Sequence, residues 1–434
     1  MIVVGAGVAG LAAARRLRRA GKRVLVLEQA DMVGGRVQTA MIAGCQYELG
    51  AEFLASFYTR TLALIAELGL NHELRPIPSR AAVFRAGRLH TLWPNPRVAL
   101  TRLIRTRNKL SLSYLVGSLM RHNGLLDLQR FARAYPIDDT DVSTYAARHL
   151  SDELLEYVLQ PALSGIFYWT PERTSRALLL IVLRAGLSRP TGLQLLTLRK
   201  GLNQLPQAMA HDLDVRQAVR VRAVERYSHG FLVRTSGGAA PTELRCAGVV
   251  VATTAAVVPQ LCPWLDADRL EFFRAVRYSR TAQLTVGAAN LPQSHYGLLF
   301  PRRETPFLAS ATLQGVKNPH SSPPGREAFC LHMSGPAANA LHELDNDRLA
   351  ALMLSELRRL LPAYYPGDPL FRQVSRWPEA LPEFDVGHFA RLQHFAEGAI
   401  ELPGLTFAGD YVGGPFIEGA IVSGEQAAER LLQL

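Results

Sequence analysis

Cysteine is scarce in this chain of 434 residues, which contains only four of them. No two cysteines stand in a C-x-x-C spacing, so the sequence predicts neither a zinc site nor a disulfide framework and favours a reducing compartment. No apolar run reaches the roughly 18 residues that a membrane-spanning helix needs. Because the first residues already have the composition of a strand, we expect no signal peptide and a cytoplasmic location. The cysteines are Cys45, Cys246, Cys262 and Cys330.

Lysine is also scarce, so arginine supplies almost all of the net charge of +11. A genome-wide compositional bias is the default explanation for such a share of arginine, and the functional alternatives are an acidic ligand or an anionic membrane surface. Nucleic acid is not expected, because no recognised binding motif accompanies the charge. Residues 93–198 have a helical pattern in which arginines are scattered among Leu, Ile and Val. A basic amphipathic helix can lie on an anionic bilayer, although the pattern is more often a solvated helix face. The sequence therefore leaves open a peripheral contact with a membrane.

Glycine, in contrast, is concentrated in a motif at the start of the chain. Gly5, Gly7 and Gly10 follow an apolar strand over residues 2–4 in the spacing G-x-G-x-x-G and lead into a helix over residues 11–20. The first glycine allows a tight turn, the second lets a pyrophosphate approach bare backbone, and the third lets helix and strand pack closely. The helix N-terminus presents free N–H groups to the phosphates. The motif predicts a dinucleotide site that includes Gly5, Gly7, Val8, Ala9 and Gly10.

A second strand over residues 24–27 ends in Glu28, which is placed to accept hydrogen bonds from a ribose diol and to repel a 2′-phosphate. Gly34, Gly35 and Arg36 follow a few positions later. Two glycines bring the backbone close to a ligand, and a guanidinium can neutralise a pyrophosphate in a forked geometry. These residues strengthen the prediction of a dinucleotide site but leave the choice of dinucleotide open.

Three segments resemble the flavin-dependent amine oxidase superfamily, and with its other segments the chain is most similar to the protoporphyrinogen oxidase type of that superfamily. They are GAGVAGLAAARRL and VLVLEQADMVGGR near the start and GDYVGGPFIEGAIVSGEQAAERL near the end. The resemblance implies FAD, because the amine oxidases, protoporphyrinogen oxidases and phytoene-type desaturases of this superfamily all bind it. No cysteine lies near the closing motif, so we expect the FAD to be bound non-covalently.

The resemblance also implies further cofactor contacts from the middle and the end of the chain. The N-terminus of the closing helix would point at the flavin ring, where a helix dipole stabilises the negative charge of the reduced form. A protein that binds only NAD would not need this second element, so FAD is favoured over NAD. The implied contacts are Gly50, Ala51, Val221, Gly409, Asp410, Glu418, Gly419 and Ala420.

The implied fold class is α/β, with a Rossmann-like FAD-binding domain of the glutathione reductase and amine oxidase type. A substrate domain made of a sheet and helices would be inserted into it. The expected FAD-binding domain is discontinuous and comprises residues 1–78, 200–265 and 385–434. The expected substrate-binding domain comprises residues 79–92 and 266–384. A helical subdomain is expected over residues 93–199.

Alternation and turn residues predict several further elements. A hairpin is expected over residues 80–92, with its turn at Ala86 and Gly87. A proline-rich loop is expected between the strands 278–289 and 328–334. The other expected strands cover residues 215–225, 231–235, 249–252 and 405–408, and the expected helices cover residues 59–68, 345–361 and 419–432.

A flavin oxidoreductase must hold a substrate C–H bond against the cofactor in an apolar pocket and needs little acid–base machinery. We therefore assign no catalytic residue and no metal site from the sequence. The pocket candidates are the aromatic residues Phe167, Trp169, Trp377 and Phe416, although core packing explains each of them equally well. Arg97 is the candidate for pairing with a carboxylate of the substrate.

Three substrate classes remain open. DVSTYAARHLSDELLEYVLQPALSGIF, LRKGLNQLPQAMA and RWPEALPEFDVGH resemble protoporphyrinogen oxidases, so we favour hydride removal from a large apolar substrate such as protoporphyrinogen or coproporphyrinogen. A carotenoid or squalene-type desaturase is an alternative, because the ending FIEGAIVSG looks more like a desaturase or an amine oxidase. A flavin amine oxidase is less favoured, because Gln283 stands where those enzymes carry a lysine. Escort proteins of small GTPases share this fold without flavin chemistry, but the intact Arg36, Asp410 and glycine motifs argue against that alternative.

Overall fold

The computed structural model describes residues 1–78, 81–92, 101–187, 192–238, 240–289, 291–398 and 402–433. One end of the molecule contains a five-stranded parallel sheet in the order β10-β2-β1-β14-β20. All three residues of the central strand β1 are buried, as expected for a parallel sheet covered on both faces. The strands are β1 (Ile2–Val4), β2 (Leu25–Leu27), β10 (Asp214–Arg216), β14 (Val249–Val251) and β20 (Leu405–Phe407).

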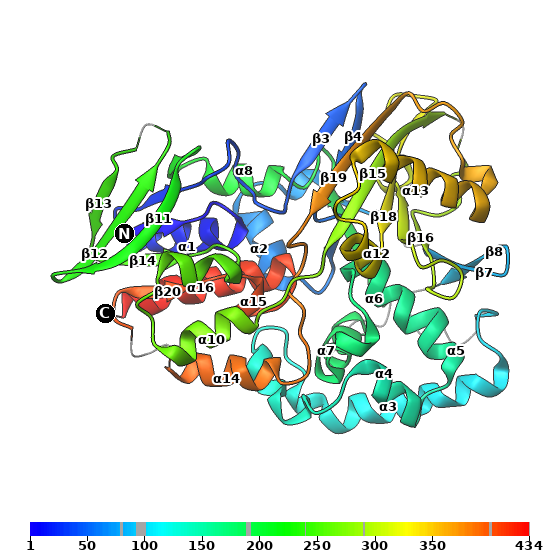
Figure 1. The fold of residues 1–434 in the computed structure, drawn as a ribbon, viewed down its shortest axis with the longest axis horizontal. Coiled ribbons are helices and arrows are strands. Elements are labelled where there is room, and N and C mark those ends of the chain that lie inside the picture. Colours follow the sequence, from blue (N-terminus) through cyan, green and yellow to red (C-terminus); the bar gives the residue numbers. More distant parts are fainter. Residues whose placement is uncertain are drawn as a thin grey trace.

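The first and last long helices of this region pack against each other, although they lie at opposite ends of the chain (Figure 1). They are α1 (Val8–Arg19) and α16 (Ile417–Leu432). A Cβ added at Gly424 would lie 2.1 Å from the carbonyl oxygen of Ala9, so the two backbones approach too closely for a side chain there. The predicted strand, glycine turn and helix at the start are confirmed, and so is the closing helix, which begins at Ile417 instead of Gly419.

A separate three-stranded antiparallel sheet lies beside the parallel one (Figure 1) and consists of β11 (Arg220–Tyr227), β12 (Gly230–Ser236) and β13 (Glu243–Cys246). The prediction of one strand over residues 215–225 was wrong. Its first residues form β10 in the parallel sheet, and its remainder forms β11. Between them the chain turns at Ala218, where φ is +55° and the backbone N–H donates to the carbonyl oxygen of Ala30 at 2.8 Å.

The other end of the molecule contains a seven-stranded, mostly antiparallel sheet in the order β19-β15-β18-β17-β16-β7-β8. The predicted hairpin is confirmed as β7 and β8. The prediction of a loop between residues 289 and 328 was wrong, because this segment supplies two strands and the short helix α11 (Gln314–Lys317). The strands are β7 (Ala81–Arg85), β8 (Arg88–Leu92), β15 (Thr281–Ala289), β16 (Gly297–Leu299), β17 (Leu308–Leu313), β18 (Arg326–Met333) and β19 (Phe371–Trp377).

Helix α13 (Asn346–Leu360) covers one face of this sheet, as Figure 1 shows. Asp345 caps its N-terminus by accepting a hydrogen bond from the Arg348 backbone N–H at 2.9 Å. The apolar side chains Leu349, Met353 and Leu357 are fully buried in a core that they share with the sheet. This helix matches the predicted amphipathic helix.

Helices dominate the described part of the predicted helical region, and they lie below the seven-stranded sheet in Figure 1. Strand β9 (Leu195–Leu198) then returns the chain to the rest of the molecule, where it pairs with β5 (Leu54–Ala55) and β6 (Leu74–Pro76). The main helices are α3 (Ser111–His122), α4 (Val142–His149), α6 (Gln160–Phe167) and α7 (Arg176–Gly186).

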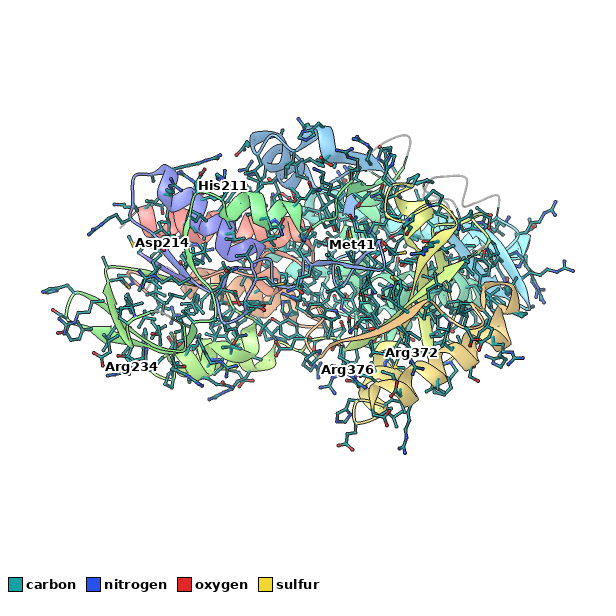
Figure 2. The ribbon with its side chains drawn as sticks, turned by 90° about the horizontal axis from the view of Figure 1, so that it is seen from above. Met41, His211, Asp214, Arg234, Arg372 and Arg376 are labelled. Atoms are coloured by element: carbon teal, nitrogen blue, oxygen red, sulfur yellow. The ribbon has the colours of Figure 1, made fainter. Side chains whose placement is uncertain are left out.

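Two main cores therefore organise the described residues, one around the parallel sheet and one between the seven-stranded sheet and α13. Figure 2 shows the same arrangement from above, with Asp214 and Arg234 towards one end and Met41, Arg372 and Arg376 beyond the middle, in the other half. The division into three domains stays a prediction. Among the described helices, none combines the length and the apolar character needed to cross a bilayer.

Candidate cofactor site

The opening glycine motif has a distinct geometry at each glycine. Gly5 has a φ of +102°, in the left-handed region that favours glycine. A Cβ at Gly10 would lie 2.0 Å from the carbonyl oxygen of Gly5, so only glycine lets α1 start this close to β1. A Cβ at Gly7 would meet no described atom within 4 Å. The turn is therefore tightly packed at Gly5 and Gly10, whereas space remains beside Gly7, next to the N-terminus of α1.

Glu28 lies at the end of β2, beside this turn. Its carboxylate accepts hydrogen bonds from the backbone N–H groups of Ala6 at 2.7 Å and Ala30 at 2.9 Å, and its side chain is mostly buried. Each bond goes to a different oxygen, so each oxygen keeps acceptor capacity for a ligand hydroxyl. The backbone N–H of Val219 donates to the Glu28 carbonyl oxygen at 2.8 Å. Val221, on β11, is therefore only two residues from a direct contact with Glu28.

A second glycine turn lies against the first. The Gly34 backbone N–H donates to the carbonyl oxygen of Ala6 at 2.9 Å, and Gly35 has a φ of +57°. A Cβ at Gly35 would lie 3.4 Å from the Cα of Gly7. The structure thus brings the two predicted glycine segments together around the open position at Gly7.

Arg36 connects the opening of the chain to its closing motif. Its guanidinium contacts both carboxylate oxygens of Asp410, at 2.8 and 2.9 Å, and also donates to the carbonyl oxygen of Ala380 at 2.9 Å. Asp410 begins the short helix α15 (Asp410–Gly413), immediately after β20 and Gly409, and its side chain is 6% exposed. The forked contact is one that lysine cannot reproduce.

The segment after β4 (Cys45–Glu48) lies beside Arg36. The Ala51 backbone N–H donates to the carbonyl oxygen of Arg36 at 2.9 Å, and a Cβ at Gly50 would lie 2.1 Å from the same oxygen. The indole N–H of Trp377 donates to the carbonyl oxygen of Leu49 at 2.5 Å. Trp377 therefore lies against the predicted cofactor segment.

The N-terminus of α16 is tightly packed, because a Cβ at Gly419 would lie 2.3 Å from the Gly414 carbonyl oxygen. The Glu418 side chain, in contrast, binds the start of another helix. It accepts hydrogen bonds from the backbone N–H of Arg60 and from the N–H and hydroxyl of Thr61, at 2.7–2.8 Å. It thereby satisfies the N-terminus of α2 (Thr59–Glu67), so a contact of Glu418 with the cofactor would come from its backbone. The role of Ala420 stays a prediction as well.

Three of the four aromatic pocket candidates form one group. The rings of Phe167 and Trp169 stack with centroids 4.4 Å apart, and the ring of Phe416 lies 5.8 Å from that of Phe167. Phe416 directly precedes α16. The indole nitrogen of Trp169 is buried and has no hydrogen-bond partner among the described residues. Trp377 lies apart from this group, and Arg97 lies outside the described residues.

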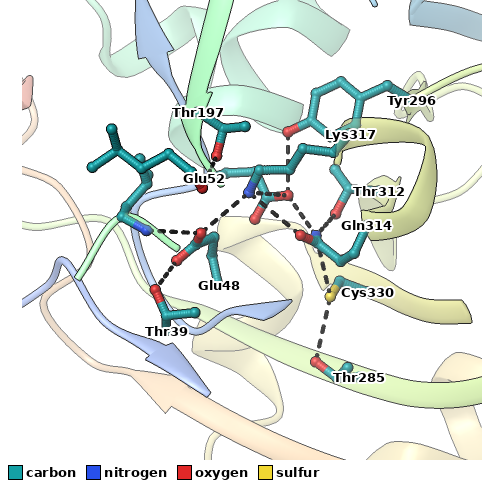
Figure 3. A network of polar contacts seen from close by, with 12 residues as sticks. Thr39, Glu48, Glu52, Thr197, Thr285, Tyr296, Thr312, Gln314, Lys317 and Cys330 are labelled. Atoms are coloured by element: carbon teal, nitrogen blue, oxygen red, sulfur yellow. Dashed lines mark hydrogen bonds and ion pairs between the residues drawn. The ribbon is translucent and has the colours of Figure 1, made fainter. Parts of the chain in front are cut away.

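Gln283, at the position where amine oxidases carry a lysine, is buried on β15. Its amide donates to the Glu48 carbonyl oxygen at 2.8 Å and to the Thr285 hydroxyl at 3.0 Å. Sequence reasoning missed a neighbouring group of charged residues, Glu48, Glu52 and Lys317, shown in Figure 3. The only sequence signal was the rarity of lysine, which does not reveal that Lys317 is buried.

These features define a class of protein: an α/β oxidoreductase whose parallel sheet, glycine turns and closing helix form a dinucleotide site. The family comparison names the class, because the model of the flavin-containing amine oxidoreductases matches residues 8–432. The chain belongs to this family. It is an FAD-dependent oxidoreductase.

Individual proteins resemble it over their whole length. Coproporphyrinogen III oxidase of Bacillus subtilis (strain 168) is 23% identical over 480 residues, which cover 100% of this chain and 97% of that protein. A solved structure from Exiguobacterium sp. 255-15, assigned as a protoporphyrinogen oxidase, has a TM-score of 0.80 at 23% identity and covers 100% of this chain and 98% of that one. Putrescine oxidase bound to putrescine has a TM-score of 0.79 at 19% identity, with the same coverage. The structural likenesses show the fold.

The residues described above fit FAD. The open position at Gly7, next to the α1 N-terminus, leaves bare backbone for a pyrophosphate, and Glu28 keeps free acceptor capacity for a ribose. When bound, FAD supplies the acceptor for a hydride and its two electrons. The protein's part is to hold the cofactor and to orient the substrate against it.

Proposed function

We propose that this protein is a porphyrinogen oxidase, which removes hydride from a large, mostly apolar tetrapyrrole such as coproporphyrinogen III or protoporphyrinogen IX. The observation that carries the proposal is the end-to-end likeness to the Bacillus coproporphyrinogen III oxidase, over 100% of one chain and 97% of the other. Arg97 is proposed to pair with a substrate carboxylate. The group of Phe167, Trp169 and Phe416 would supply an apolar wall for the macrocycle.

The cofactor contacts proposed for FAD are those of the two glycine turns, Glu28, Arg36 and the closing motif. In this proposal Arg36 and Asp410 hold the opening and closing pieces together, so that both can reach one FAD. Gly50 and Ala51 would pass beneath the flavin ring, and Val221 would contact the adenine. These roles are supported by two contacts: the Ala51 N–H donates to the Arg36 carbonyl oxygen, and the N–H of Val219, two residues before Val221, donates to the Glu28 carbonyl oxygen.

An amine oxidase is the second candidate, supported by the family and by the fold of putrescine oxidase. Gln283 counts against it, because its amide is engaged by the Glu48 carbonyl and the Thr285 hydroxyl and carries no charge. A desaturase of carotenoids or squalene-like lipids rests only on the closing sequence FIEGAIVSG.

Anaerobic mixing of the purified protein with single substrates distinguishes these functions. We expect coproporphyrinogen III or protoporphyrinogen IX to bleach the flavin absorption without oxygen, and porphyrin fluorescence to appear faster than in buffer alone once an electron acceptor such as oxygen is admitted. If putrescine is the one tested substrate that bleaches the flavin, the protein is an amine oxidase. If a squalene-like lipid is the one that does so, the protein is a desaturase. If neither porphyrinogen reduces the flavin, the proposal is wrong.

The protein is further proposed to bind the surface of an anionic membrane through the region around α3. Residues 74–126 contain ten Arg and Lys residues and no Asp or Glu. Within this stretch Leu110, Val116 and Met120 are exposed apolar side chains at 78%, 52% and 75%. Exposed apolar groups beside a purely basic segment favour anionic lipid over water.

Sedimentation with vesicles tests this membrane proposal. We expect binding to vesicles that contain phosphatidylserine, weaker binding to pure phosphatidylcholine, and a loss of several-fold in Val116→Ser/Met120→Ser. Met41→Ser is the matched control, because Met41 is an exposed methionine on β3 (Thr39–Ile42), outside this region. Equal binding of the two variants, or no binding to either vesicle, would contradict the proposal.

A further inference from the structure

Two buried carboxylates share one buried lysine next to the proposed cofactor segment. Glu48 and Glu52 lie on either side of Gly50 and Ala51, and Lys317 is the last residue of α11. The Lys317 ammonium lies 3.5 Å from an oxygen of each carboxylate (Figure 3). The exposed fractions of the side chains are 1% for Glu48, 11% for Glu52 and 3% for Lys317. We call these three residues the Lys317 cluster.

The two carboxylates differ in how well their oxygens are satisfied. Glu48 accepts a hydrogen bond from the Thr39 hydroxyl at 2.6 Å on one oxygen and from the Leu202 backbone N–H at 3.1 Å on the other. The donors to Glu52 all reach a single oxygen, Oε1, and they come from Gln314, Tyr296 and Lys317. Glu52 Oε2 is buried and contacts no hydrogen-bond donor among the described residues. An unsatisfied buried acceptor is costly, so this oxygen calls for an explanation.

The Lys317 cluster is also short of one positive charge. Neither carboxylate forms an ion pair with a second Arg or Lys among the described residues. Burial raises the pKa of Glu48, although Lys317 and the Thr39 hydroxyl act in the opposite direction. A buried net charge of −1 is unfavourable at low dielectric, so the cluster gains by accepting one proton.

The position of Glu52 connects the cluster to the proposed reaction. Glu52 directly follows Ala51, whose N–H is bound by the Arg36 carbonyl. On its other side are groups of the seven-stranded sheet and the end of α6, and the charge of Glu52 acts on their pKa values. Burial together with this charge raises the pKa of Tyr168, and burial lowers the pKa of His332. The titratable groups that face Glu52 are Glu48, Tyr168, Tyr296, Lys317, Cys330 and His332.

We propose that Glu52 is the base that accepts the substrate's N–H proton, and that Lys317 and Gln314 are positioning residues that hold its carboxylate. This inference rests on the proposed function. In each oxidation a C–H bond of the substrate breaks and its electron pair leaves with the hydrogen as hydride to the bound flavin. The hydride leaves from the carbon that bridges two pyrroles, and the ring C=C electron pairs of one pyrrole shift to form an exocyclic C=C bond to that carbon. The N–H bond of this pyrrole breaks, its electron pair forms the ring C=N bond, and its proton forms an O–H bond on Glu52.

The charge balance of the cluster supports this direction of proton transfer. Before the transfer two carboxylates face one ammonium, and after it one carboxylate faces one ammonium. The proton therefore moves to a place where it removes a buried net charge, instead of creating one. A porphyrinogen or an amine can supply this proton from nitrogen, whereas a polyene has no N–H group. The site consequently favours a substrate that carries N–H next to the carbon that is oxidised.

Glu52→Gln is the direct test, because the amide keeps the shape of the side chain and loses the base. We expect the rate of flavin reduction by coproporphyrinogen III to fall about 100-fold or more, with FAD content unchanged. Glu327→Gln is the matched control, since Glu327 is a buried carboxylate beside α11 whose two oxygens are bonded to the Gly315 N–H and the Gln293 amide.

Infrared spectra of the resting protein give a readout that does not depend on turnover. The difference between wild type and Glu52→Gln should contain carboxylate bands of Glu52 at neutral pH. Absence of these bands, or a variant with the wild-type rate, would overturn the assignment of the base. Failure of the wild-type flavin to be reduced by porphyrinogens would instead overturn the proposed function, so the two failures are distinguishable.

Discussion

Buried charge is arranged differently in two regions of this molecule. Between the opening and closing motifs, Arg36 and Asp410 pair one to one, in a forked contact at 2.8–2.9 Å. Beneath the seven-stranded sheet, the Lys317 cluster sets two carboxylates against one ammonium at 3.5 Å. The first arrangement is neutral and has short, directional bonds. The second is charged, looser and leaves one carboxylate oxygen without a donor.

This difference suggests different uses for the two groups. A balanced, well-bonded pair is suited to holding two distant pieces of chain in register, and it has little reason to exchange a proton. An unbalanced buried group has a perturbed affinity for protons, which is common at sites of chemistry. We therefore interpret Arg36 and Asp410 as the connection that builds the FAD site, and the Lys317 cluster as the acid–base group beside it.

The largest expected effect comes from Lys317→Met, which leaves two buried carboxylates without a cation. Breaking a buried ion pair by removing one partner costs about 3–5 kcal/mol in the free energy of unfolding. The loss should depend on pH. Burial holds the folded-state pKa of Glu48 above its ordinary value of 4.5, so the variant's stability falls as the pH rises through that raised pKa and recovers below it.

Urea unfolding at neutral and at mildly acidic pH measures this effect. Lys200→Met is the matched control, because the ammonium of Lys200 also faces a buried glutamate, Glu73 at 3.7 Å, but is itself exposed. The control should lose little stability at either pH. If the free energy of unfolding of Lys317→Met is lowered by the same amount at both pH values, the cluster is not short of a positive charge.

A smaller effect, on cofactor affinity, is expected from Arg36→Lys. Lysine keeps the charge but loses the fork, and a hydrogen bond between charged groups contributes about 1.5–3 kcal/mol. The dissociation constant of FAD should rise about 10- to 100-fold, measured by reconstituting the apoprotein and following flavin fluorescence. Arg16→Lys is the control, since Arg16, on the opening helix α1, also contacts a carboxylate of the closing helix α16, Glu429, but that contact is exposed. Equal FAD affinity of the two variants would show that Arg36 does not contribute to FAD binding.

Local signals in the sequence were enough to predict several elements at both ends of the molecule. The strand–turn–helix at Gly5–Gly10, the strand that ends before Glu28 and the hairpin at Ala86 each depend on residues within a short window, and the structure confirms those elements. The strands β16 and β17 were missed because they are short and lie between segments rich in proline and other turn residues, and because β16 also pairs with the distant strand β7. The division at Ala218 was missed because it is imposed by hydrogen bonds that the N–H groups of Ala218 and Val219 donate to the distant carbonyl oxygens of Ala30 and Glu28.

The candidate site could be predicted only where its residues form a motif. Gly7, Glu28 and Arg36 belong to recognisable patterns, whereas Glu52 and Lys317 do not. These two meet because α11 follows a strand of the seven-stranded sheet that no local pattern indicated, and the burial of a lysine depends on that packing. The roles of the predicted cofactor and pocket residues stay predictions until ligand binding is measured.

The central claim is that the two distant glycine-rich pieces hold a single FAD that accepts hydride from a porphyrinogen. The absorption spectrum of the purified protein, recorded before and after anaerobic addition of coproporphyrinogen III or protoporphyrinogen IX, tests it most directly. The account predicts one FAD per chain, released by acid precipitation and bleached by at least one of the two substrates. A colourless protein that fails to take up added FAD would contradict it.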